Sequence, residues 1–280
     1  MNWKRISVGL VLLGCLIVIP DLQAQKHAQN WYFGNKVGLV FDGRYPMPLT
    51  DGQMNAREGV AAISDTTGAL ICYTDGQTVW NMNHQEIAWE LEGNPLSTMS
   101  GYILPSRIHS NQYILFTTTI ITNGNDGPIV PDGGHYYIMD FSSSNPGGLI
   151  VNDHNSLGTG PIQERSVEKI LGIPFPESII GESLNKPGYW LLTHEFDRWT
   201  FGVSKFDESH YDYGEIQIGE THSNDNNDFG ANRGAIGYIT SSIQGDKIAI
   251  AIEGQKMIEV LRFNNETGHL QPFTQLPAGD

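Results

Sequence analysis

Cysteine is nearly absent from this 280-residue chain, which contains only Cys15 and Cys72. Cys15 lies in an apolar leader, so removal of that leader leaves one thiol and excludes an intramolecular disulfide. Cys72 stands between Ile71 and Tyr73 in an apolar stretch, which is typical of a small core residue rather than of a nucleophile. The sequence therefore predicts a fold that is held together by packing alone.

Positive charge is also scarce, with 16 Lys and Arg residues against 31 Asp and Glu and a net charge of −15. Runs of basic residues are missing, and a strongly acidic surface repels phosphate backbones and anionic lipids. These features exclude nucleic acid as a partner and disfavour binding at a membrane surface. Protein partners, neutral glycans and divalent cations remain compatible with this charge.

Long apolar runs are confined to the leader, where Lys4 and Arg5 precede the stretch Ile6–Ile19 and Ala24 offers a cleavage site. This pattern predicts a signal peptide over residues 1–24. The run is shorter than the roughly 20 residues that a membrane-spanning helix needs, so we expect an exported protein without membrane insertion after cleavage. An alternative is a lipoprotein box at residues 12–15 with Cys15 as the acylated residue, although the apolar run continues beyond it.

A repeated pattern of strands is the dominant positive feature after residue 56, and four cycles each begin with an apolar strand followed by a second one. The first strands are expected at 59–64, 101–105, 169–173 and 234–239, and the second strands at 69–74, 112–118, 188–194 and 246–253. Units of this kind cannot bury both faces alone and must stack about an axis. The sequence therefore predicts an all-β fold, a β-propeller of four-stranded antiparallel blades of WD40-like type.

The expected boundaries follow from this repeat. Blades are predicted at about 57–100, 101–164, 165–232 and 233–280, all within a propeller region 57–280. The preceding region 25–56 contains an aromatic strand near Asn30, which is interpreted as a strand that closes the ring by completing the last blade. Four blades are at the lower limit for closure, so we expect the chain to be an incomplete part of a larger, seven-blade-like ring.

A family resemblance rests on a set of short motifs in the first blade and ahead of it. These are Asn30-Trp31-Tyr32-Phe33-Gly34, Glu58-Gly59-Val60-Ala61, Ser64-Asp65, Tyr73-Thr74-Asp75-Gly76, Val79-Trp80-Asn81 and Asn83-His84. With them the chain resembles the N-terminal propeller-like region of gliding-motility-associated and type IX-secreted surface proteins of Bacteroidetes. The resemblance covers most of the mature chain and is strongest from residue 30 to 120.

The resemblance implies a cell-surface location and a part in adhesion. In that family the propeller precedes immunoglobulin-like or PKD-type modules and a type B sorting domain, which this sequence does not show. We expect a secreted or cell-surface protein, or a periplasmic one if the sorting domain is truly missing. The family implies no enzymatic activity that could be assigned to particular residues.

Arginines recur near the first strand of each cycle, and they are the first set of candidate ligand-binding residues. They are Arg57, Arg107, Arg165 and Arg233. Equivalent positions in successive blades converge on the axis, where a ring of guanidinium groups would bind an anion. The alternative, which we favour, is ion pairing between blades.

Aromatic side chains form the second set, because they can stack on sugar faces or anchor a protein partner. Most of these rings are expected to pack between blades. If any are exposed together, they are Trp80, Trp89 and Trp199, because polar or charged neighbours surround these three. By contrast, Asp75-Gly76 between two strands predicts a tight hairpin turn rather than a site.

One loop carries oxygen side chains at alternating positions, as calcium loops do. They belong to Asn224, Asn226 and Asp228, but the glycine and the terminal glutamate of a calcium loop are missing. A mobile polar loop has the same composition, so no cofactor is expected, with Ca²⁺ the one candidate. The sequence favours a noncatalytic module that binds protein or glycan. A carbohydrate-active propeller enzyme, hydrolase or lyase, and a structural spacer are the alternatives.

Overall fold

Strands make up most of the structure. The computed structural model describes residues 23–95, 97–118, 134–156, 167–180, 186–195, 199–208, 211–219 and 237–277. Helical structure within these ranges is limited to short 3-10 turns, η1 (Gln23–Ala28), η3 (Glu177–Ile179) and η4 (Glu253–Gln255). None of the described helices is long and apolar enough to cross a membrane. The leader up to residue 22 lies outside the described residues.

Four sheets of four consecutive antiparallel strands form the main part of the fold. We call them the first to fourth blades. They are β4 (Ala61–Ser64), β5 (Leu70–Thr74), β6 (Val79–Asn81) and β7 (Glu86–Ala88); β8 (Gly101–Pro105), β9 (Gln112–Thr118), β10 (Gly134–Asp140) and β11 (Leu149–Ser156); β12 (Val167–Pro174), β13 (Tyr189–Glu195), β14 (Thr200–Phe206) and β15 (Tyr211–Gln217); and β16 (Ile239–Ser241), β17 (Lys247–Ile252), β18 (Met257–Asn264) and β19 (His269–Pro277). The predicted all-β, propeller-like fold of four-stranded antiparallel blades is confirmed.

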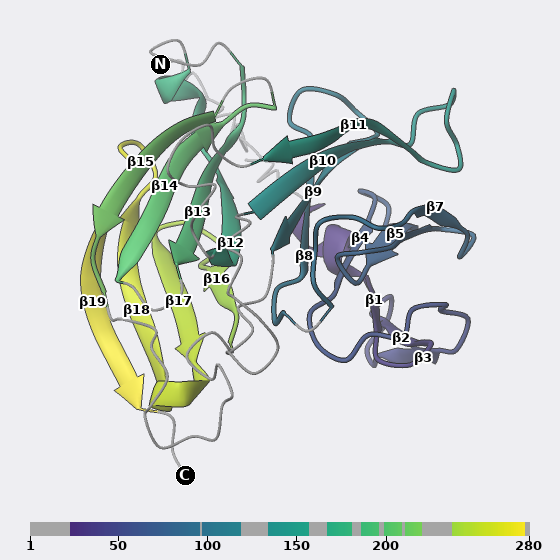
Figure 1. Ribbon diagram of the computed structural model, residues 1–280, viewed down its shortest axis with the longest axis horizontal. Helices are drawn as coiled ribbons and strands as arrows, with labels where there is room; N and C mark the ends of the chain where they lie inside the picture. The colour runs from purple at the N-terminus through teal and green to yellow at the C-terminus, as the bar shows by residue number, and fades with distance from the viewer. Residues whose placement is uncertain are drawn as a thin grey trace, which may run out of the picture.

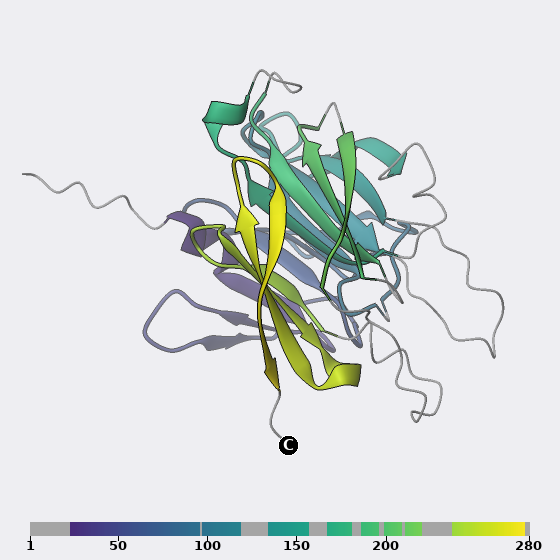
Figure 2. The same cartoon turned by 90° about the vertical axis from the view of Figure 1, so that its left-hand side faces the viewer.

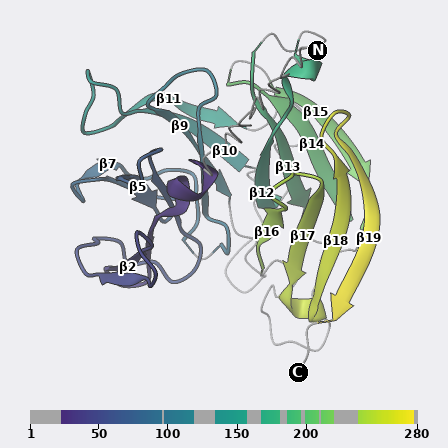
Figure 3. The same cartoon turned by 180° about the vertical axis from the view of Figure 1, so that it is seen from behind.

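The blades are arranged so that their first strands meet. Strand β4 lies beside β8, β8 beside β12, and β12 beside β16, while the later strands of each blade point outward. Figure 1 shows the result as an arc of sheets about a common centre, with the fourth blade at one end and the N-terminal strands at the other. The view from behind shows the same order (Figure 3). We call this centre, where β4, β8, β12 and β16 lie side by side, the hub.

The N-terminal strands form a sheet of their own and do not join the fourth blade, so a ring-closing role for them stays a prediction. β1 (Asn30–Phe33) pairs with β2 (Val37–Val40), which pairs with β3 (Met47–Leu49), in a separate three-stranded sheet. A three-residue turn after Phe33 folds the chain straight back, so β1 finds its partner locally and does not need the fourth blade. This N-terminal sheet packs beside the first blade, with β1 next to β4. That the chain belongs to a larger ring stays a prediction.

Alternating side chains explain how neighbouring blades pack. In β17, the sequence KIAIAI buries every second residue, and the isoleucines at 248, 250 and 252 face the third blade. Strand β18 follows the same period, with Leu261 and Phe263 buried and Arg262 and Asn264 exposed. The fourth blade therefore has one apolar face toward the third blade and one face toward solvent.

A chain of hydrogen bonds joins the N-terminal sheet to the first blade. The Tyr32 hydroxyl donates to Asp51 Oδ1 at 3.0 Å, and Asp51 Oδ2 lies 3.3 Å from Nε2 of His84. Nδ1 of His84 lies 3.1 Å from the Tyr73 hydroxyl, which also accepts the Gln53 N–H. The imidazole of His84 therefore connects the carboxylate of Asp51 to the hydroxyl of Tyr73 through its two ring nitrogens. The rings of Tyr32 and Tyr73 also stack, with centroids 4.4 Å apart, and so add an apolar contact between the N-terminal sheet and the first blade.

Side chains that bond to turn carbonyls join the other blades. Between the third and fourth blades, Trp190 Nε1 donates to the Asn265 carbonyl at 2.7 Å, and Asn265 Nδ2 donates back to the Pro174 carbonyl. Between the second and third blades, the Tyr189 hydroxyl donates to the Pro105 carbonyl at 2.7 Å. Burial raises the pKa of Tyr189 well above its usual range, which keeps this donor protonated. These bonds join the second blade to the third and the third to the fourth.

Candidate functional site

The three candidate tryptophans have different environments. Trp80 is buried, at 6% exposure, and its ring stacks on Tyr73 at 5.5 Å, so the expectation that it is exposed is wrong. Its strand lies inside the first blade, and the N-terminal sheet covers it. Trp89 and Trp199 are exposed, at 66% and 53%, but they belong to the first and third blades and neither lines the two cavities described below.

The candidate arginines do not form a ring in the part of the chain that the structure describes. Arg107 Nη1 donates to the carbonyls of Phe175 and Gly188 at 2.8 and 2.9 Å, so it joins the second blade to the third. Its partners are backbone carbonyls, whereas the sequence favoured carboxylates. Arg57 is exposed. Arg165 and Arg233 lie outside the described residues.

The candidate calcium residues Asn224, Asn226 and Asp228 also lie outside the described residues. Among the residues that are described, no three His, Cys, Asp or Glu side chains are grouped in a way that could hold a metal ion. Asp75 accepts the N–H groups of Gln77 and Thr78, which confirms the hairpin turn predicted there. Cys72 is fully buried, and burial raises the pKa of its thiol, as expected for a core residue.

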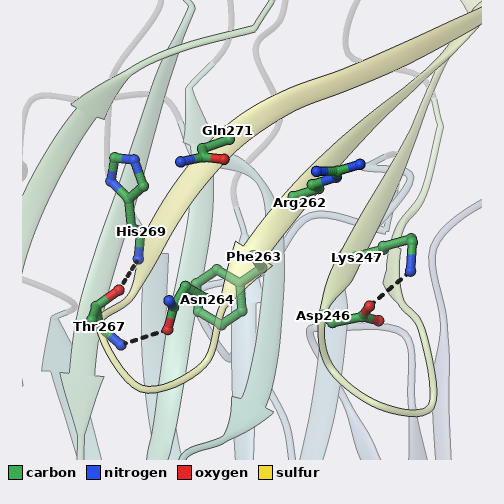
Figure 4. A pocket seen from close by; sticks show the side chains of 8 residues that line it. All are labelled: Asp246, Lys247, Arg262, Phe263, Asn264, Thr267, His269 and Gln271. Atoms are coloured by element: carbon green, nitrogen blue, oxygen red, sulfur yellow. Dashed lines mark hydrogen bonds and ion pairs between the residues drawn. The ribbon is translucent and has the colours of Figure 1, made fainter.

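A polar groove lies across one end of the fourth blade, with a volume of about 710 Å³. We call it the β18 groove. It is lined by Asp246, Lys247, Arg262, Phe263, Asn264, Thr267, His269 and Gln271. Figure 4 shows the Asn264, Thr267 and His269 side chains on one side, the Asp246–Lys247 pair on the other, and Arg262 and Gln271 between them. The hairpin that carries most of these residues is the yellow one in Figure 2.

Strand register brings the groove residues into rows. Lys247 on β17 is opposite Arg262 on β18, and Arg262 is opposite Gln271 on β19. Asn264 and His269 form the next pair along the same hairpin. Because side chains of opposed residues in an antiparallel sheet share a face, these five point to the solvent side of the blade.

Charge in the groove is partly compensated. Lys247 Nζ lies 2.7 Å from Asp246 Oδ2, and Ser242 Oγ donates to Asp246 Oδ1 at 2.7 Å. The hydrogen bond from Lys247, followed by that from Ser242, lowers the pKa of Asp246, so the carboxylate is ionised at neutral pH and accepts hydrogen bonds. The Arg262 guanidinium lies over the Phe273 ring at 4.6 Å, which holds its donors in place.

The turn at the end of the groove is fixed by its own sequence. Asn264 Oδ1 accepts the N–H groups of Glu266 and Thr267, and Gly268 follows with a φ of +72°. A side chain at Gly268 would collide with the ring of Trp190, because a Cβ built there comes within 2.6 Å of it. Trp190 of the third blade therefore positions the end of the groove by close contact with a glycine.

A second cavity, of about 610 Å³, lies at the hub. We call it the hub pocket. It is lined by Ala28, Trp31, Tyr32, Phe33, Val60, Ala61, Ala62, Met99, Gly101, Tyr102, Ile103, Tyr238 and Ile239. These residues come from the first strands of four sheets, β1, β4, β8 and β16, and from short segments beside them. The lining is apolar and aromatic, and none of its side chains is charged.

Sequence reasoning missed both cavities. The alternation in Met257–Asn264 is a signal for the exposed face of β18, yet it does not reveal which side chains of β17 and β19 lie beside it. For the hub pocket no local signal exists, since its residues are contributed by segments as distant as Trp31 and Tyr238. Only the stacking of sheets brings them together.

Comparison with known proteins adds little beyond the fold. No protein-family model and no curated protein matches the chain. Among solved structures, a functionally unknown protein of Desulfotomaculum acetoxidans is 9% identical with a TM-score of 0.45, covering 89% of this chain and 67% of that one. A Lactobacillus plantarum protein is 9% identical, with a TM-score of 0.41 and coverage of 89% and 55%.

A third similar structure is a candidate 6-phosphogluconolactonase of Bacteroides fragilis, 9% identical with a TM-score of 0.43, covering 90% of this chain and 66% of that one. This chain thus spans between 55% and 67% of the length of the three structures. At these identities and TM-scores we transfer no activity from them.

Proposed function

We propose that the protein is an exported, noncatalytic propeller-like module that binds a neutral glycan in the β18 groove. The observation that carries the proposal is the row Lys247–Arg262–Gln271 across three adjacent strands, with Asp246 and Asn264 beside it. Sugar hydroxyls both donate and accept hydrogen bonds. The groove offers donors from lysine and arginine, an acceptor from the ionised Asp246, and amides that do both.

The shape and charge of the groove support a neutral ligand. It is an open groove on a sheet face, which suits an extended chain of sugar rings, and the exposed Phe273 ring beneath Arg262 adds an apolar surface. Lys247 is paired with Asp246, so the local positive charge is reduced. A protein with a net charge of −15 repels polyanions at long range, which disfavours acidic glycans.

Binding to a panel of neutral and acidic polysaccharides, followed by calorimetry on the best neutral oligosaccharide, tests the proposal. The variant Arg262→Ala should weaken binding about tenfold, and Gln271→Ala about threefold, because charged hydrogen bonds are stronger than neutral ones. The affinity should change little between low and high salt, since an uncharged ligand makes no long-range ion pairs.

The matched control is Arg44→Ala. Arg44 is also exposed and also lies over an aromatic ring, that of Tyr45 at 5.4 Å, but it belongs to the loop before β3. This variant should bind the glycan like the unmodified protein. Equal losses in Arg262→Ala and Arg44→Ala, or binding only to acidic polysaccharides, would contradict the proposal.

Export is the second part of the proposal, and it is supported by the charged, apolar leader at residues 1–24. A cell-surface or secreted location follows from the resemblance described above. Mass spectrometry of the protein recovered from its host should show an N-terminus at Gln25. An acylated N-terminus at Cys15 would instead identify a lipoprotein, and an intact Met1 would contradict export through this leader.

A further inference from the structure

Aromatic rings line the hub pocket, and several of them are exposed to solvent, whereas rings in a closed core would be buried. The rings of Trp31, Phe33 and Tyr238 line it and are 50%, 36% and 51% exposed. Tyr32 and Tyr102 contribute to the same lining. A cavity of about 610 Å³ falls in the range of small-molecule sites, roughly 300 to 1,000 Å³. The hub therefore has the size and the lining of a ligand site.

The tryptophan in this pocket is held in a fixed orientation. Trp31 Nε1 donates to the Ala28 carbonyl at 2.8 Å, which ties the indole to the end of η1. The ring of Phe41 packs against it at 4.8 Å. An exposed ring that is already immobilised loses little conformational entropy when a ligand stacks on it.

Negative charge adjoins the aromatic lining, although the lining itself is uncharged. Burial raises the pKa of Tyr238, and the negative charge of nearby Glu58 raises it further, which places that carboxylate within electrostatic reach of the ring. The protein as a whole carries a net charge of −15. A cation entering the hub therefore meets aromatic faces and a negative field together, and both attract it.

We infer that the hub pocket binds a small organic cation through its ammonium group, with quaternary or methylated ammonium as the preferred head. Aromatic faces attract such a group by their quadrupoles, and its methyl substituents keep the cost of leaving water low. The site lies on other elements than the β18 groove and takes a different class of ligand, so the two sites are independent.

Calorimetric titration with choline tests this inference. The reference ligand is the neutral carbon isostere of choline, in which a carbon atom replaces the quaternary nitrogen. Choline should bind about tenfold more tightly than the isostere, because only the cation gains from the rings and the carboxylates. Equal or tighter binding of the isostere, or no saturable binding of choline, would overturn the inference.

Three variants locate the site. Trp31→Ala should raise the choline Kd about tenfold, Trp31→Phe less than this because a ring remains, and Glu58→Gln about two- to threefold. Trp89→Ala, which removes a tryptophan of similar exposure from the first blade, is the control and should leave the Kd unchanged. Thermal unfolding of each variant verifies that it is folded. A loss in Trp89→Ala that matches the loss in Trp31→Ala would also overturn the inference.

Discussion

The β18 groove and the hub pocket are built in opposite ways. The groove is polar, and its residues come from one end of three adjacent strands in a single blade. The hub pocket is apolar, and its residues come from the first strands of four different sheets. In Figure 1, the groove belongs to the fourth blade at one end of the arc, and the pocket belongs to the centre that the sheets share. Local hairpin register determines the groove, whereas the packing of sheets on one another determines the pocket.

This difference predicts how each region responds to perturbation. A substitution on the solvent face of β18 changes the groove without disturbing the fold, because the affected side chains make few contacts. The hub pocket depends on the angle between sheets, so any change that loosens a contact between sheets alters it. The three predictions below separate these two kinds of dependence.

The largest effect is expected for Trp190→Ala. Trp190 is 5% exposed, donates to the Asn265 carbonyl, and packs edge-to-face with Phe175 and Phe263. Its removal leaves a large void between the third and fourth blades and should lower the free energy of unfolding by about 3 to 5 kcal/mol. Urea unfolding measures this change. The affinity of the β18 groove for the glycan should also fall, since Trp190 packs against the turn at Gly268.

Trp199→Ala is the control for that experiment, because Trp199 is half exposed in the same blade. Its unfolding free energy should change by less than about 0.5 kcal/mol, as for ordinary surface substitutions. A similar loss in both variants would show that the contact between blades is not what Trp190 contributes.

An intermediate effect is expected for Tyr73→Phe. The variant keeps the ring stack on Tyr32 but removes the hydroxyl that accepts from Gln53 and is hydrogen-bonded to His84. The part-buried N–H of Gln53 loses its acceptor, and urea unfolding should show a loss of about 0.5 to 1.5 kcal/mol, the usual net contribution of one hydrogen bond. Choline affinity at the hub should fall as the N-terminal sheet loosens, while glycan affinity at the groove stays unchanged. Equal loss at both sites would contradict the division made above.

The smallest effect concerns alkaline pH. Burial, followed by the charge of Asp65, raises the pKa of Tyr113 in the second blade to about 12. The unfolded phenol ionises near pH 10 and the folded one later, so its contribution to stability is complete below pH 10 and is lost as the pH rises toward 12. In Tyr113→Phe, the fall in stability over this interval should be shallower, as measured by unfolding at a series of pH values.

The unmodified protein and Tyr113→Phe should have parallel stability profiles below pH 9, because there the phenol of Tyr113 is uncharged in both the folded and the unfolded state. Identical slopes for the two proteins above pH 10 would show that Tyr113 is not the group that titrates.

The repeat of apolar strands was sufficient to predict the fold. The stretch Gln112–Thr118 was expected as a strand and forms β9 with the same bounds, because its near-continuous apolar run is typical of a strand with both faces buried. Asp75-Gly76 was expected as a turn, and the carboxylate of Asp75 caps it. Both predictions succeeded because the decisive interactions lie within a few residues of one another.

The same reasoning failed for Trp80. Polar neighbours suggested that Trp80 is exposed, but the N-terminal sheet packs on its blade and buries it among Tyr32, Met54 and Tyr73. The segment that covers Trp80 is the one that was expected to close the ring. The polar neighbours of Trp80 report on its own strand and carry no information about a sheet that packs over it.

The amino-acid sequence by itself determined the repeat of four-stranded blades, the burial of Cys72 and the turn at Asp75-Gly76, since each depends on side-chain alternation or turn chemistry over short spans. The tertiary structure alone decided that Trp31 and Tyr238 share a cavity, that Arg107 bonds to carbonyls of the next blade, and that His84 connects Asp51 to Tyr73. The physical reason is that these contacts depend on the angle at which one sheet packs on the next. That angle is set by the summed contacts of whole faces rather than by any single stretch of residues.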